Sequence, residues 1–159
     1  MAIALRNFLI QCIAMKSKNL SSVLVFIFAG QILTHAADWP QYRGPSHDGS
    51  TPEKISTTWP TEGPKQLWKA QLGDSFGSFA VANGKAFCFV QRKAKGADAE
   101  VAIALDANTG KELWATPLGK PTYDKQGGDG PRSTPTVDGD RVYYLGAYLV
   151  LSCLDAKTG

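Results

Sequence analysis

The sequence has few of the residues that most often build catalytic and metal sites. Its 159 residues include 3 cysteines and 2 histidines, and the first of each kind lies before residue 37. His47 is the sole histidine after that point, and no second histidine or cysteine stands at the spacing of a zinc site. Neither a glycine-rich phosphate loop nor a nucleophile elbow is present. The sequence therefore lacks the usual signatures of zinc, nucleotide and serine-hydrolase sites.

Acidic residues are missing from the start of the chain, where none precedes Asp38. The basic residues in that stretch are Arg6, Lys16 and Lys18, and they account for the formal net charge of +3. The remaining lysines and arginines equal the aspartates and glutamates in number, so the body of the protein is neutral. Because a nucleic-acid binder carries its positive charge on the folded part, no nucleic-acid partner is predicted.

A hydrophobic run long enough to span a bilayer is also missing. The longest run, residues 23–33, has eleven residues, whereas a membrane-spanning helix needs about 20. Basic residues precede this run and small residues follow it, which is typical of a signal peptide. We predict a signal peptide over residues 1–36, cleaved after Ala36, with Met15 as an alternative start and an uncleaved anchor as the alternative reading. The mature protein is therefore expected to be exported, periplasmic or secreted, with no stable membrane span.

The clearest feature that is present is an internal repeat. Leu-Asp-Ala-X-Thr-Gly occurs at residues 105–110 and again 49 residues later, at 154–159. Trp68 and Trp114 each stand before a Leu-Gly pair at a similar offset. Repeats of this length are typical of the four-stranded blades of a β-propeller. The predicted organisation is an N-terminal segment over residues 37–66, a first blade repeat over 67–119, and a second, truncated blade repeat over 120–159.

Turn residues separate the apolar segments of each repeat. Asn-Gly at 83–84 and Asp-Gly at 138–139 lie between such segments, and these dipeptides supply the positive φ angles of two-residue β-hairpins. The segments that follow, residues 86–90 and 141–145, are largely apolar. A strand with one face in water would alternate, so both are predicted to be covered on both faces by stacked blades. The fold class is therefore predicted to be all-β.

Each residue of the repeated turn has a structural task. Asp106 and Thr109 can bond backbone N–H groups within the turn, and Gly110 takes a backbone conformation that a Cβ disfavours. Trp114 follows in the next strand, where its ring can pack between blades. A metal ligand or a catalytic base is the alternative role for Asp106, but a catalytic residue is rarely needed once per blade. The candidate residues are therefore predicted as a structural repeat motif: Trp68, Asp106, Thr109, Gly110, Trp114, Asp155, Thr158 and Gly159.

These motifs resemble a known family. Residues 104–114 resemble the tryptophan-docking repeat of the pyrroloquinoline-quinone-like (PQQ-like) repeat proteins, in the quinoprotein alcohol dehydrogenase-like superfamily. Residues 38–45 and 130–139 also resemble members of this superfamily. The resemblance implies a β-propeller of four-stranded antiparallel blades, of which about two are present. The chain is then an N-terminal fragment, and the propeller is incomplete.

The resemblance implies two alternative functions. Dehydrogenases of the superfamily hold PQQ on the propeller axis, with a calcium or lanthanide ion bound by Glu, Asn and Asp, and an Asp as general base. Many of them also have a disulfide between adjacent cysteines that stacks on the cofactor. No residue here matches these positions and no two cysteines are adjacent, so no catalytic, cofactor-binding or metal residue is predicted. We expect an exported non-catalytic scaffold that binds proteins or envelope components. The alternative is the N-terminal fragment of a PQQ-dependent dehydrogenase of alcohols or sugars, with PQQ and Ca²⁺ held by the missing blades.

A few further residues leave alternatives open. Residues 42–49 are predicted to form a surface turn. Arg132, in a Gly/Pro-rich insertion, is either a solvated loop arginine or a ligand for an anion in the axial channel. Cys88 and Cys153 lie in apolar runs and are predicted to be buried thiols, with a disulfide as the alternative. Two blades alone leave apolar faces and strand edges uncovered, so we expect the chain to self-associate or to be poorly soluble.

Overall fold

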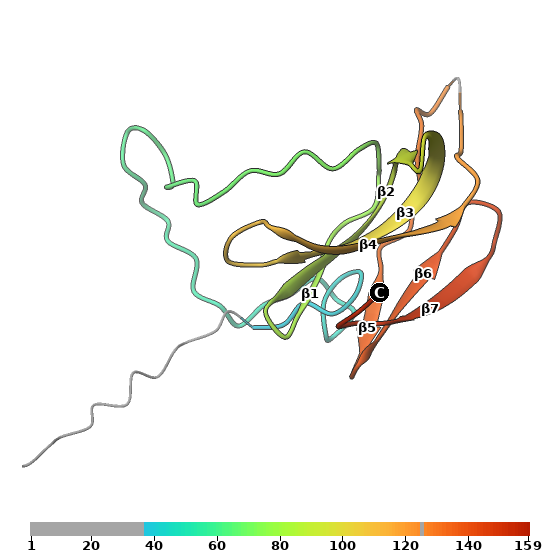
Figure 1. The fold of residues 1–159 in the computed structure, drawn as a ribbon. Coiled ribbons are helices and arrows are strands. Elements are labelled where there is room, and N and C mark those ends of the chain that lie inside the picture. The colour runs from blue at the N-terminus through green and yellow to red at the C-terminus, as the bar shows by residue number, and fades with distance from the viewer. Residues whose placement is uncertain (1–36, 125) are drawn as a thin grey trace, which may run out of the picture. The chain divides into compact units, whose positions relative to one another are not determined.

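The computed structural model describes residues 37–124 and 126–159. The predicted signal peptide and the alternative start at Met15 lie outside these residues. The described part of the chain is all-β and contains two antiparallel sheets (Figure 1). No helix among the described residues is long and apolar enough to cross a membrane. The predicted fold class is confirmed, and the open pair of sheets fits an incomplete β-propeller.

The first sheet has four strands in sequence order, each hydrogen-bonded to the next. Asn83 and Gly84 join the first two strands with φ angles of 51° and 70°, as the Asn-Gly motif predicts. Lys95 and Gly96 join the next two, again with positive φ at both positions. The strands are β1 (Ala80–Ala82), β2 (Lys85–Ala94), β3 (Ala97–Asp106) and β4 (Glu112–Gly119).

The second sheet has three strands, also in sequence order. Its first turn differs by one residue from the prediction, because Asp138 pairs with Arg141 and the two-residue loop is Gly139 and Asp140. Gly139 is the first of the two loop residues and has a φ of 56°. A type II′ turn requires a glycine with positive φ at this position. The bounds predicted for the two blade repeats stay a prediction. The strands are β5 (Thr136–Asp138), β6 (Arg141–Leu145) and β7 (Leu151–Asp155).

The two sheets share a hydrophobic core. Phe89 of β2 and Tyr144 of β6 are both 1% exposed, and their rings meet edge to face with centroids 5.3 Å apart. The other face of the first sheet buries Cys88 and Ile103, against which Trp68 from the segment before β1 packs. The apolar segment of the first repeat is thus covered on both faces, as predicted, but among the described residues its second face is covered by the segment before β1 and not by a stacked blade.

The corresponding strand of the second sheet, β6, does not follow that prediction. Two of its five residues, Val142 and Tyr144, are buried, while the alternate residues are exposed or half-buried. The prediction that both faces of the strand are covered is therefore wrong for β6, because among the described residues no further sheet packs on its second face. Cys153 of β7 pairs with Tyr143 on that face and is exposed, contrary to prediction, whereas Cys88 is buried; both thiols are free.

The segment before β1 connects the first strands of both sheets. Trp39 exchanges backbone hydrogen bonds with Val81 of β1 at 2.7 and 2.9 Å, and the carbonyl oxygen of Pro40 accepts from Val137 N–H of β5 at 2.8 Å. Residues 42–49 follow as the predicted surface turn. Backbone bonds from one short segment thus hold the two sheets together at this end.

Candidate functional site

Two tryptophans dock onto the two copies of the repeated turn. The Trp68 Nε1–H donates to the carbonyl oxygen of Ala107 at 3.0 Å. Gly110 has a φ of 70°, and a Cβ at this position would overlap the Trp68 ring. This first dock connects the segment before β1 to the turn between β3 and β4.

Trp114 docks in the same way one repeat later. Its Nε1–H donates to the Ala156 carbonyl oxygen at 3.3 Å, and a Cβ on Gly159 would lie 2.7 Å from its ring. The Thr116 hydroxyl donates to the Gly159 carbonyl oxygen at 2.8 Å. Because Trp114 lies on β4 and Gly159 follows β7, the second dock joins the two sheets.

The two repeated aspartates bond their own turns. Oδ1 of Asp106 accepts from two backbone N–H groups and from the Thr109 hydroxyl, at 2.8 to 3.0 Å. Oδ1 of Asp155 makes the corresponding contacts, including the Thr158 hydroxyl, at 2.8 to 2.9 Å. These bonds lower the pKa of both carboxyl groups, chiefly through the Thr109 hydroxyl at Asp106 and the Thr158 N–H at Asp155. Both carboxylates are engaged within the motif.

Thr109→Ala is expected to raise the pKa of Asp106 toward its ordinary value of 3.8, because the Thr109 hydroxyl is the largest cause of its lowering. In the wild-type chain, the carboxyl carbons of Asp106 and Asp155 should titrate below pH 3.8 by NMR. Since the folded pKa is depressed, the ionised turns stabilise the fold above pH 3.8, and this contribution is lost as the pH falls through the folded pKa. Asp155 is the internal control, and an unchanged Asp106 midpoint would contradict the assignment.

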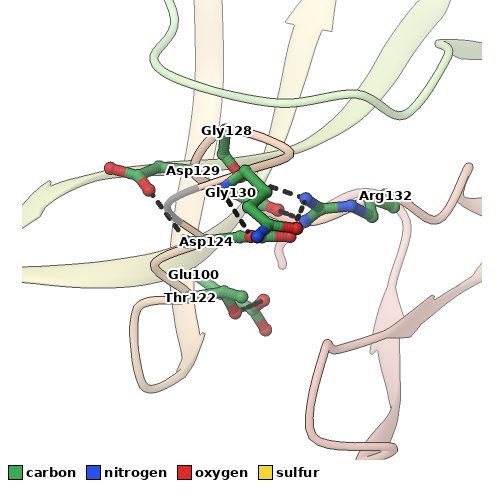
Figure 2. Close-up of polar contacts among 8 residues, drawn as sticks. Glu100, Thr122, Asp124, Gly128, Asp129, Gly130 and Arg132 are labelled. Carbon is green, nitrogen blue, oxygen red and sulfur yellow. Dashed lines mark hydrogen bonds and ion pairs between the residues drawn. The ribbon is translucent and has the colours of Figure 1, made fainter.

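The insertion that leads to the second sheet is organised by Arg132 (Figure 2). Its guanidinium donates to the carbonyl oxygens of Gly128 and Gly130, both at 3.0 Å, and pairs with Asp124 Oδ2 at 3.2 Å. Its Cζ also lies 5.0 Å from the centroid of the Phe76 ring. The side chain is bound to its own loop, which favours the loop-arginine reading over an anion ligand.

The structure adds a residue that the sequence motifs did not single out, Glu100 of β3 (Figure 2). It is 1% exposed, and its carboxylate accepts from the Thr122 hydroxyl at 3.0 Å and from Ala147 N–H at 3.2 Å. Its register partner on β2, Gln91, is also buried and accepts from Thr122 N–H at 2.6 Å. In the sequence, the burial of Glu100 is signalled only by its place directly before the apolar run 101–105. The pattern cannot show more, because the burial depends on contacts with the second sheet.

The loop between β6 and β7 presents apolar side chains to solvent. Leu149 is 81% exposed with a φ of 61°, and its neighbours Tyr148 and Val150 are 60% and 58% exposed. Backbone bonds close the loop, from Gly146 N–H to the Val150 carbonyl oxygen and from Leu149 N–H to the Gly146 carbonyl oxygen. The hairpin between β2 and β3 in the first sheet has the polar Lys95 at its tip instead.

No group of three or more His, Cys, Asp or Glu side chains is placed to hold a metal ion in residues 37–124 and 126–159. The ring nitrogens of His47 lie within hydrogen-bond distance of the Gln41 amide, inside the surface turn. The expectation that PQQ and Ca²⁺ would need residues from further blades stays a prediction.

Comparison with known proteins agrees with the repeat geometry. No curated protein matches the sequence significantly. A family model does match, that of outer membrane protein assembly factor BamB, over residues 58–159, which is more than half of the chain. The match spans both tryptophan docks, both aspartate turns and the strands of both described sheets. The chain therefore belongs to this family of PQQ-like repeat proteins, and its two sheets are blades of an incomplete β-propeller.

Proposed function

We propose that this protein is an exported, non-catalytic β-propeller scaffold that binds a protein of the cell envelope through its β6–β7 loop. The observation that carries the proposal is Leu149, a bulky apolar residue that is 81% exposed and held at a φ of 61°. The positive φ alone does not mark the site, because Lys95 at the tip of the β2–β3 hairpin has one too, of 52°. What distinguishes Leu149 is its exposed apolar side chain, which does not stabilise this fold and favours a role in binding.

The loop that presents Leu149 is anchored before any partner binds. The Tyr148 hydroxyl donates to the Pro121 carbonyl oxygen at 3.2 Å, and Ala147 N–H donates to the Glu100 carboxylate. An ordered loop loses less conformational freedom on association, so more of the contact energy appears as affinity. Tyrosine, here the exposed Tyr148, is one of the residue types enriched at binding hot spots.

The choice of an envelope protein as partner rests on the leader and on the family. Residues 1–36 carry the sequence features of a signal peptide, and the matching family is named for an outer membrane protein assembly factor. A partner that meets an exported protein is itself in the envelope or outside the cell. The envelope is the location that both observations favour.

The non-catalytic part of the proposal is supported by how the candidate carboxylates are used. Asp106 and Asp155 each accept bonds from their own turn, whereas a general base needs an acceptor directed at its substrate. In a protein that includes the further blades and is supplied with PQQ and Ca²⁺, we therefore expect no dye reduction by alcohols or sugars. Dye reduction that requires both additions would favour the dehydrogenase alternative.

A photo-crosslinking residue in place of Leu149 is expected to capture one or a few envelope proteins in cells that export the chain. The captured chain should begin at Ala37, which checks the predicted cleavage. The matched control is the same replacement at Lys95, which is also exposed at a hairpin tip and also has a positive φ, of 52°. Equal capture at both positions, or none at either, would overturn the assignment of the docking site.

A further inference from the structure

We infer that the pocket between the two blades binds a primary ammonium group, carried by a small apolar amine or a lysine side chain, with the Glu100 carboxylate as counter-ion. The pocket has a volume of about 470 Å³, within the range of small-molecule sites. Phe89, Leu118 and Val150 supply apolar walls, and Glu100 lies among the lining residues. An apolar pocket with one placed charge suits a ligand that is apolar except for one cationic group.

The Glu100 carboxylate lacks a counter-ion within the part of the chain that the structure describes. No ion pair there includes it, and its donors, the Thr122 hydroxyl and the Ala147 N–H, are neutral. A carboxylate can accept about four hydrogen bonds, and a buried charge is costly unless it is paired. A cation in the pocket would supply both the missing charge and further donors.

Two glycines give the pocket access to the carboxylate. Gly119 and Gly146 both line the pocket, and Cβ atoms added to them would lie 3.4 and 2.8 Å from Glu100 Oε2. Neither glycine has a positive φ, so the backbone conformation does not require glycine at either position. Any larger residue at either position would crowd Oε2, so the two glycines leave the carboxylate as part of the pocket wall.

The chemistry of the pocket restricts the class of cation. An alkylammonium group has three donors for the free acceptor positions of one carboxylate, whereas Ca²⁺ needs about six to eight oxygen ligands. Lys120, whose side chain is exposed, also lines the pocket but forms no ion pair with Glu100 among the described residues. The ligand is therefore a monocation whose remaining part is apolar.

Saturation-transfer NMR on the full chain tests this with n-butylammonium as the probe and n-butanol as its neutral counterpart. The method observes the small molecule and tolerates self-association of the protein. We expect saturation transfer to the butyl protons of the ammonium probe. Its affinity should exceed that of butanol by about tenfold or more, the difference that a charge-assisted hydrogen bond makes.

Two variants and a matched control locate the binding. Glu100→Gln keeps an acceptor for Thr122 and Ala147 but removes the charge, and it should weaken butylammonium binding by about tenfold or more. Gly119→Ala leaves Glu100 in place and narrows the pocket beside Oε2, so it should also weaken binding if Glu100→Gln fails to fold. Glu62→Gln, the same change at an exposed glutamate outside the pocket, should leave binding unchanged.

The two sources of the ammonium group are separated with an N-acetylated Gly-Lys-Gly amide. Transfer to its lysine side chain assigns the pocket to a protein side chain, and transfer to butylammonium alone assigns it to a small amine. Equal binding of butanol and butylammonium, or binding unaffected by both pocket variants, would overturn the inference. Leu149→Ser should leave butylammonium binding unchanged, so this test does not depend on the proposed docking site.

Discussion

Phe89→Ala is expected to destabilise the fold by about 3–5 kcal/mol, the range for a buried phenylalanine replaced by alanine. Phe89 is 1% exposed and meets Tyr144 edge to face, so its removal opens a cavity in the core that the two sheets share. The measurement is urea unfolding followed by circular dichroism. Several protein concentrations separate unfolding from self-association.

The matched control is Phe79→Ala, the same change at a phenylalanine that is 40% exposed. It should cost less than about 1 kcal/mol, as surface substitutions usually do. Trp114→Ala should fall between the two, because its ring packs against the shared core but is only partly buried. Equal losses at Phe79 and Phe89 would show that the sheets do not depend on this core.

Gly110→Ala is expected to destabilise the fold by about 2–5 kcal/mol. Alanine at position 110 would have to adopt the φ of 70°, and this left-handed conformation costs a residue with a Cβ roughly 1–2 kcal/mol. The added Cβ also overlaps the docked Trp68 ring, and overpacking of this kind adds about 1–3 kcal/mol. The loss is measured as a shift in the urea midpoint together with the NMR signal of the Trp68 indole N–H, which is resolved from those of the other three tryptophans.

Gly84→Ala separates the two contributions. Gly84 has the same φ of 70°, but a Cβ there meets nothing within 4 Å. It should therefore cost only the strain, about 1–2 kcal/mol, and leave the indole N–H signal of Trp68 unchanged. If Gly110→Ala cost no more than Gly84→Ala, the docked ring would not be the reason for glycine at position 110.

Glu100 takes part both in holding the β6–β7 loop and in lining the inter-blade pocket. Its carboxylate bonds Ala147, which precedes the exposed apolar tip, and lines the pocket between the sheets. Glu100→Gln retains an acceptor for Ala147, so it should affect ammonium binding far more than capture at Leu149. The two proposals therefore predict different outcomes for one substitution.

The sequence by itself determined the features that depend on neighbouring residues. The Asn83-Gly84 turn forms where the dipeptide predicts it, because its positive φ angles are a local preference. The Asp106 turn repeats at Asp155 with the same bonds, since each carboxylate contacts only residues two or three positions ahead. The all-β class and the family also follow from such local patterns and from their recurrence.

The tertiary structure alone decided what depends on the neighbouring sheet. β6 has nearly the same apolar pattern as β2, but β2 is covered on both faces and β6 on one, because burial depends on what packs against a strand. Cys153 is exposed for the same reason. Glu100 is buried because residues more than twenty positions away supply its hydrogen bonds and its cover. A single-sequence pattern carries no record of such partners, and here they define the pocket and the presented loop.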